Sequence, residues 1–297
     1  MTRTPFDQFS KQFLEEFLTS LGEVIPNLEV PGESRFADIW FTPSPQPSIN
    51  PQTLGLLGRI ASTPCLLEPF RNQPKITEIR NCLLKLFLVQ ADSQRQKRRD
   101  AENIPESELP WLWILASSAS DTIINGFGAS RDETWPDGVY FLATYFKTAI
   151  IAINQLPRTE ETLWLRLLGK GTTQQLAVEE VIAIPTDNQR RLTALKLLAN
   201  WKISIEAKAE IDQEDRELIM TLSQAYLEWE EKTERRGIQQ GQRLVVENLL
   251  KVRFGEVDEQ LASIIPNLLD LPTEEYTRLL LQFSREELLA RFENPRA

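Results

Sequence analysis

The hydrophobic residues at the start of the chain recur at helical spacing, with a phenylalanine at every third or fourth position from Phe6 to Phe17. This stripe predicts a helix that begins after Thr4 and ends at Gly22. Short apolar segments bounded by polar or proline-rich stretches follow, and they are typical of buried strands. We expect strands over residues 28–30, 35–41, 65–70, 111–115, 139–142 and 149–154, and helices over 54–60, 75–98 and 119–127.

After residue 157 the apolar positions follow helical spacing only. The pattern predicts helices over residues 160–168, 173–184, 189–206, 212–236, 243–254, 257–265, 274–283 and 285–292. Gly237 and Gly241 should loosen or end the charged helix that precedes them, and Ser284 with Glu287 forms a capping box for the last helix. The sequence therefore predicts an α+β core followed by an all-helical C-terminal half. We expect three regions, residues 1–156, a helical extension over 157–236 and a small helical domain over 237–297.

The composition excludes several classes of catalytic and metal site. The 297 residues include no histidine and two cysteines, Cys65 and Cys82. This excludes Ser-His-Asp and Cys-His hydrolysis, and zinc sites built on imidazole or on four thiolates. Both cysteines fall in apolar segments, so we expect buried, reduced thiols. Catalysis would have to use Asp, Glu, Lys, Ser, Thr or Tyr, with an oxygen-preferring metal.

Localisation and partners follow from hydropathy and charge. No apolar run reaches the length of a membrane span, and the first residues contain no hydrophobic signal core, so we expect a cytoplasmic protein without a membrane partner. The net charge of −10 does not favour nucleic-acid binding, but local patches decide phosphate contact. The basic run Arg95, Lys97, Arg98 and Arg99 either contacts a DNA backbone or complements a helix C-terminus.

Two carboxylates lie in predicted strands where water-facing residues are not expected. Asp38 shares a strand face with Phe36 and Trp40, and Glu68 shares one with apolar neighbours in Cys65–Phe70. Burying a charged carboxylate among apolar side chains costs several kcal/mol, on the order of its desolvation penalty, unless a cation or hydrogen-bond donor compensates the charge. A shared divalent cation, Mg²⁺ or Mn²⁺, is the simplest partner for both. The alternative is that water, backbone amides or a salt bridge satisfies each carboxylate separately.

The element order, with an acid in the second strand and another in the third, resembles the PD-(D/E)XK nuclease fold. The segments Thr4–Lys11, Leu54–Arg59 and Cys65–Asn72 look like the Rpn family of recombination-promoting nucleases, or transposases, in a cyanobacterial branch. Residues 241–292 resemble an uncharacterised helical domain that often ends such proteins. Together the resemblances cover most of the chain.

The resemblance implies a set of site residues. Asp38 and Glu68 would hold Mg²⁺, and an acid from the first helix, Glu15 or Glu16, would complete the site. We take Glu16 with Asp38 and Glu68 as the candidate catalytic residues. The bound metal would neutralise a phosphodiester and lower the pKa of its water.

The sequence departs from the family pattern at the lysine that should follow the third-strand acid by two residues. Phe70 occupies this position, and strand alternation places Arg71 on the other face. Lys75 or Lys85 on the following helix could substitute. We therefore expect a metal-dependent DNA endonuclease of Rpn type with a weak or degenerate site. The alternative is a non-catalytic interaction protein, whose C-terminal helices bind a protein partner or form a homodimer.

Overall fold

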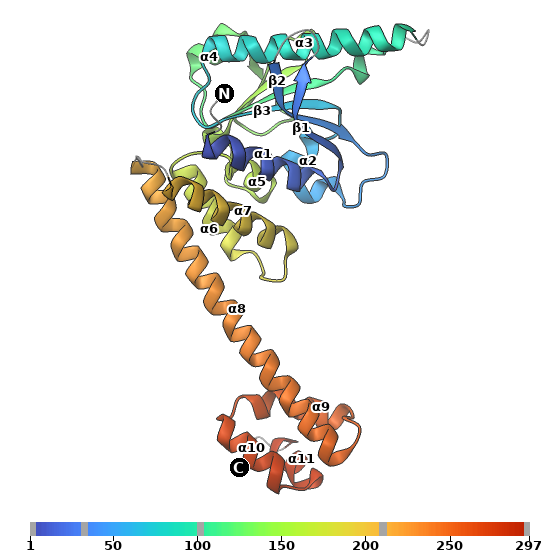
Figure 1. Ribbon diagram of the computed structural model, residues 1–297, viewed down its shortest axis with the longest axis vertical. Helices are drawn as coiled ribbons and strands as arrows, with labels where there is room; N and C mark the ends of the chain where they lie inside the picture. Colours follow the sequence, from blue (N-terminus) through green and yellow to red (C-terminus); the bar gives the residue numbers. More distant parts are fainter. Residues whose placement is uncertain (1–3, 31–34, 100–103, 208–212, 294–297) are drawn as a thin grey trace. The chain divides into compact units, whose positions relative to one another are not determined.

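The computed structural model describes residues 4–30, 35–99, 104–207 and 213–293. It divides into two compact units, residues 1–226 and residues 227–297. The first unit contains a mixed sheet with helices on both faces, and the second contains helices alone (Figure 1). The predicted α+β class is therefore confirmed.

Seven strands form one sheet in the order β1-β2-β3-β4-β7-β6-β5. Strand β2 is antiparallel to both of its neighbours, β1 and β3, whereas β4 pairs parallel with both β3 and β7. At the far edge, β6 and β5 return to antiparallel pairing. The strands are β1 Gly22–Val30, β2 Arg35–Pro43, β3 Cys65–Phe70, β4 Trp111–Ala116, β5 Ser130–Arg131, β6 Val139–Phe141 and β7 Thr148–Ala152.

The helices alternate with these strands only in the first half of the chain. They are α1 Pro5–Leu18, α2 Leu56–Ile60, α3 Ile76–Arg99, α4 Asp121–Gly126, α5 Leu163–Arg166, α6 Thr172–Ala183, α7 Gln189–Glu206, α8 Gln213–Phe254, α9 Glu259–Leu269, α10 Thr273–Gln282 and α11 Arg285–Glu293. Short 3₁₀ segments cover Pro51–Leu54, Glu106–Glu108, Thr144–Phe146, Ile153–Gln155 and Glu160–Thr162. After β7, the described residues contain no further strand.

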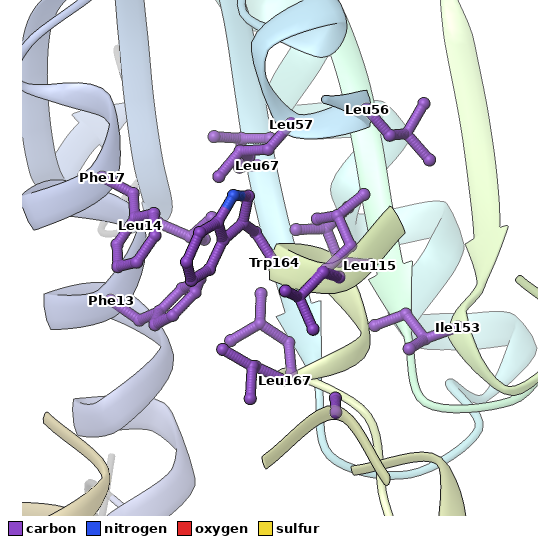
Figure 2. Close-up of a cluster of buried hydrophobic side chains, with 14 of the residues drawn as sticks. Phe13, Leu14, Phe17, Leu56, Leu57, Leu67, Leu115, Ile153, Trp164 and Leu167 are labelled. Atoms are coloured by element: carbon purple, nitrogen blue, oxygen red, sulfur yellow. The ribbon is translucent and has the colours of Figure 1, made fainter. Parts of the chain in front are cut away.

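One face of the sheet packs against α1, α2, α5, α6 and α7. The phenylalanine stripe of α1 meets Trp164 of α5 and Leu67 of β3 in the buried cluster of Figure 2. Phe17 and Trp164 have ring centroids 4.8 Å apart, and Phe9 stacks on Trp201 of α7 at 4.2 Å. This core fixes α1 beside β1 and β2.

The other face of the sheet packs against α3 and α4. Leu66 of β3, Ile114 of β4 and Ile79 of α3 lie in this second core, so β3 is covered on both faces. A third core belongs to the second unit, where α9, α10 and α11 pack against the last turns of α8 around Leu250 and Leu280. The capping box predicted for the last helix is confirmed, because Glu287 accepts from the Ser284 N–H at 2.8 Å.

Three elements differ from the sequence prediction. The first strand begins at Gly22 instead of residue 28, and it includes Pro26 because β1 is an edge strand, where a missing N–H is tolerated. The two-residue strand β5 was not predicted. The predicted end or loosening at Gly237 is wrong, because α8 continues through both glycines. A glycine costs a helix only about 1 kcal/mol, which the strong helix formers around it offset.

Candidate functional site

Asp38 and Glu68 lie opposite each other on neighbouring strands. In the antiparallel pairing of β2 with β3, Ile39 is opposite Leu67 and Trp40 is opposite Leu66, so the same register sets Asp38 across from Glu68. The Asp38 N–H also donates to Glu68 Oε1 at 3.4 Å. Glu68 alternates with Leu66 on the sheet face covered by α3, whereas Asp38 follows Ala37, which lies in that same core, and the Asp38 carboxylate contacts Lys11 of α1. The two predicted carboxylates are therefore neighbours across β2 and β3, and each contacts a lysine from a helix on a different face of the sheet.

Lys85 of α3 neutralises the buried carboxylate. Its ammonium group lies 2.8 Å from both oxygens of Glu68, and the Glu68 side chain is only 2% exposed. Lys85 reaches Glu68 because α3 packs its buried side, which includes Cys82 and Leu86, against the sheet over β4 and β2. Lys75, the other candidate, is exposed before the first turn of α3. Of the two, the structure places Lys85 at the carboxylates.

The pKa of Glu68 is raised to about 7. Burial is the largest cause, and the neighbouring charge of Asp38 adds to it, while Lys85 opposes both. Burial is the largest single effect on Lys85 and lowers its pKa, but the combined attraction of Glu68, Cys82 and Asp38 outweighs burial and raises the pKa. Lys85 therefore stays protonated at neutral pH, whereas Glu68 titrates near neutrality when no cation replaces the proton.

A second lysine binds the other carboxylate. Lys11 of α1 lies 2.8 Å from Asp38 Oδ1 and 2.9 Å from Asp7 Oδ1, and it donates to Asn27 Oδ1 at 2.9 Å. Burial works against the charge on Lys11, but the hydrogen bonds and charges of Asp38 and Asp7 outweigh it and raise its pKa. These contacts tie α1 to the first two strands beside the candidate site.

Asn27 takes an unusual backbone conformation at this point. Its φ is 54°, in the left-handed region, and it lies in β1 between Pro26 and Leu28, which pair with Ile39 and Ala37 on either side of Asp38. Asparagine tolerates this region better than most residues, because its short amide can bond locally. Here the amide oxygen accepts from Lys11, so the strained position contributes to the site.

Sequence reasoning did not identify Asp7, Lys11 or Asn27 as site residues. The available signal was the four-residue spacing of Asp7, Lys11 and Glu15, which sets them on one face of α1. Glu16 lies about 140° from Lys11 around the helix, at 100° per residue, and it is exposed. The geometry favours Asp7 or Glu15 as the acid from α1, and the catalytic role of Glu16 stays a prediction.

Phe70, in the place of the expected lysine, is partly buried against the core beneath α3. Arg71 faces the other way, as alternation predicted: its guanidinium donates to the Gly169 carbonyl at 2.8 Å and lies 4.9 Å from the Trp201 ring.

Cys65 and Cys82 are buried and free, which confirms the prediction of reduced thiols. Burial raises the pKa of the Cys82 thiol, and the charge of Glu68 adds to this.

The donor set limits how a metal ion could bind. Among the described residues, no group of three or more histidine, cysteine, aspartate or glutamate side chains could hold a metal ion. Asp38 and Glu68 supply two carboxylates on adjacent strands. Mg²⁺ is commonly held by one or two carboxylates, with water and substrate phosphate as its other ligands. Asp38 and Glu68 could hold a Mg²⁺ completed by water and substrate phosphate only if the cation displaced Lys11 and Lys85 from their oxygens.

The basic run predicted to contact either DNA or a helix end lies in the last turns of α3, where Arg95 and Lys97 are exposed. In the part of the chain that the structure describes, no helix is both long enough and apolar enough to cross a lipid bilayer.

Comparison of the chain with protein-family models, curated proteins and solved structures gives no match in any of the three.

Proposed function

We propose that this chain is a metal-dependent DNA endonuclease of the PD-(D/E)XK type, in which a lysine from α3 replaces the lysine missing from β3. The main support is the contact of Lys85 with both oxygens of Glu68 at 2.8 Å, directly across from Asp38. The order α1-β1-β2-α2-β3-α3-β4 carries one acid in the second strand and another in the third, which is the order on which the resemblance rests.

In this proposal Asp38 and Glu68 hold the cation, which when bound supplies charge neutralisation for the phosphodiester and a more acidic water. Lys85 keeps its proton at neutral pH and is therefore unsuited to act as a base. It instead stabilises negative charge that develops on the phosphate, which a preorganised buried cation does well. Lys11 holds Asp38 in place from α1.

A plasmid-nicking assay with Mg²⁺ or Mn²⁺ tests the proposal. Asp38→Asn and Glu68→Gln should abolish cutting, and Lys85→Met should reduce the rate by about 10²–10³-fold, the usual effect of removing one charge-stabilising donor. Lys75→Met is the matched control, because Lys75 precedes the same helix but is exposed. Circular dichroism of each variant separates lost activity from lost folding. Equal cutting by wild type and a folded Lys85→Met would contradict the assignment.

A non-catalytic interaction protein is the second candidate, and one observation favours it. Both carboxylates already have a lysine partner at 2.8 Å, so neither needs a cation for its charge to be compensated. If this reading holds, wild type shows no nicking with either metal. Neither metal would then raise the melting temperature of wild type more than that of Asp38→Asn.

A further inference from the structure

The ammonium group of Lys11 lies where side-chain oxygens from three different elements converge. Its Nζ is 2.9 Å from Asp7 Oδ1 of α1, 2.9 Å from Asn27 Oδ1 of β1 and 2.8 Å from Asp38 Oδ1 of β2. Two carboxylates and an amide oxygen are also donors that a hard cation such as Mg²⁺ or Mn²⁺ prefers. In the metal-free protein, Lys11 therefore takes the place of a cation among these oxygens.

The backbone of β1 supports this arrangement. Asn27 has a φ of 54°, whereas Pro26 and Leu28 on either side of it pair regularly with β2. Residues other than glycine keep such a conformation only where the surrounding contacts hold them in it. Here the amide oxygen of Asn27 comes within hydrogen-bond distance of Lys11, which gives the ammonium group an acceptor in addition to the two carboxylates.

The two lysines of the candidate site differ in what is lost when each leaves its carboxylate. If Lys11 leaves Asp38, two other oxygens still bind its ammonium group, and the Asp38 side chain is 24% exposed, so water can reach it. Lys85 contacts both oxygens of Glu68, whose side chain is only 2% exposed. Separating this second pair would leave a buried charge without compensation, which is strongly destabilising. An entering cation therefore displaces Lys11 at a lower free-energy cost than Lys85.

We propose that Lys11 is the exchangeable cation of the candidate site. It occupies Asp38 in the metal-free protein, and Asp7 and Asn27 alone hold it when Mg²⁺ or Mn²⁺ binds Asp38. Lys11 is then a built-in competitor that sets how tightly the site binds its metal, because the apparent affinity falls with the fraction of molecules in which Asp38 is free. This inference rests on the metal site of the proposed function, but it does not require that the chain cuts DNA.

Electron paramagnetic resonance of Mn²⁺ mixed with the full chain measures free and bound metal without any DNA. We expect Lys11→Met to bind Mn²⁺ at least about 10-fold more tightly than wild type, because the competitor is gone. Lys11→Arg keeps a cation at Asp38 and should stay close to the wild-type affinity. Lys75→Met removes the same charge at an exposed position, so this matched control should also bind as wild type does.

A double variant, Lys11→Met with Asp38→Asn, assigns the tighter binding to this site. It should lose the gain, since the carboxylate that Lys11 occupied is no longer there. A folded Lys11→Met that binds Mn²⁺ no more tightly than wild type, or a double variant that keeps the gain, overturns the proposal. Tighter binding that depends on Asp38, in a chain that nicks no plasmid, would support the exchange and contradict the proposed nuclease.

Lysine acetylation followed by peptide mass spectrometry measures the exchange in wild type, so this test does not depend on how a variant folds. Lys11 loses one of its three oxygen partners when the metal binds Asp38. Saturating Mn²⁺ should therefore speed the acetylation of Lys11 and leave the rate at the exposed Lys75 unchanged. An equal Lys11 rate with and without Mn²⁺ would show that Lys11 stays on Asp38, which contradicts the proposal.

Discussion

Glu68 combines burial, a two-oxygen contact with an ammonium group and a second carboxylate on the opposite strand. Burial and the charge of Asp38 raise the pKa of Glu68, and Lys85 lowers it. The first two effects together are the larger, so the pKa is raised. A cation that binds both carboxylates would remove the cause of the raised pKa. Proton and metal therefore compete for Glu68, and metal affinity should weaken as pH falls below about 7.

The raised pKa of Glu68 predicts a pH dependence of stability. Between pH 4.5 and about 7, the folded state binds more protons at this carboxyl than the unfolded state does. The free energy of unfolding should therefore fall as pH rises through this window, by on the order of 3 kcal/mol at most. Urea unfolding at pH 5, 6, 7 and 8 measures this slope without added metal.

Glu68→Gln tests the assignment of that slope. The variant has no carboxyl to titrate, so the fall between pH 5 and 8 should shrink, although loss of the ion pair with Lys85 lowers stability at every pH. Glu274→Gln, an exposed substitution on α10, is the control and should keep the wild-type slope. A slope that is the same in all three proteins would assign the effect to other groups.

The sequence predicted the pairing of Asp38 with Glu68 because strand period and apolar neighbours are local properties. It could not choose between Lys75 and Lys85, since the side of α3 that meets β3 depends on how the helix packs against the sheet. It did not predict the contacts of Lys11 with Asp38 and Asn27 for a similar reason. These contacts span 27 and 16 positions in the sequence, and they arise from the place of α1 beside β1 and β2.

Among the elements, those with a continuous local pattern were predicted best. The helices α1 and α3 and the strands β2 and β3 follow the predicted ranges to within a few residues. The prediction failed at glycines, which can end a helix or lie inside a helix or strand. Gly22 opens a strand, and Gly237 and Gly241 lie inside a helix. Neighbouring elements determine the outcome at such positions, because the local cost of glycine is small.

One glycine inside α8 and one directly after it give opposite predictions. Gly237 lies in the helix with open space around it, so Gly237→Ala should stabilise the helix by about 0.5–1 kcal/mol. Gly255 follows the helix with a φ of 88°, a conformation that alanine adopts poorly, so Gly255→Ala should destabilise by about 1 kcal/mol. Thermal unfolding of the full chain by circular dichroism measures both changes. Loss of stability in Gly237→Ala would indicate that α8 is interrupted there.

At the scale of the molecule, the first unit has a core on each face of its sheet, and the second unit has a separate core. The sequence predicted the change from strands to helices, because the apolar period changes after residue 157. The sequence analysis set the start of the C-terminal domain at residue 237, whereas the second unit begins at residue 227; both positions lie within α8, where a continuous helix has no break in its pattern.

The separate cores predict separable unfolding. Six of the seven tryptophans lie before residue 227, so tryptophan fluorescence reports mainly on the first unit. Leu280→Ala removes a side chain that is 1% exposed in the second core and should cost about 2–5 kcal/mol there. The variant should shift the circular dichroism transition and leave the fluorescence transition unchanged. Leu115→Ala, in the first unit, should shift the fluorescence transition. A common shift of both signals would show that the units unfold together.

Strand β3 carries Glu68 on one face, and the next residue after its end, Arg71, bonds Gly169 and Gln174 beside α6 on the other. Any ligand that changes the position of Glu68 therefore acts on a strand that also holds the helical layer. Thermodynamic linkage makes the effect reciprocal, so whatever loosens α6 changes ligand affinity by the same factor. Amide hydrogen exchange along α6, with and without Mn²⁺, would report the coupling at a distance from the carboxylates.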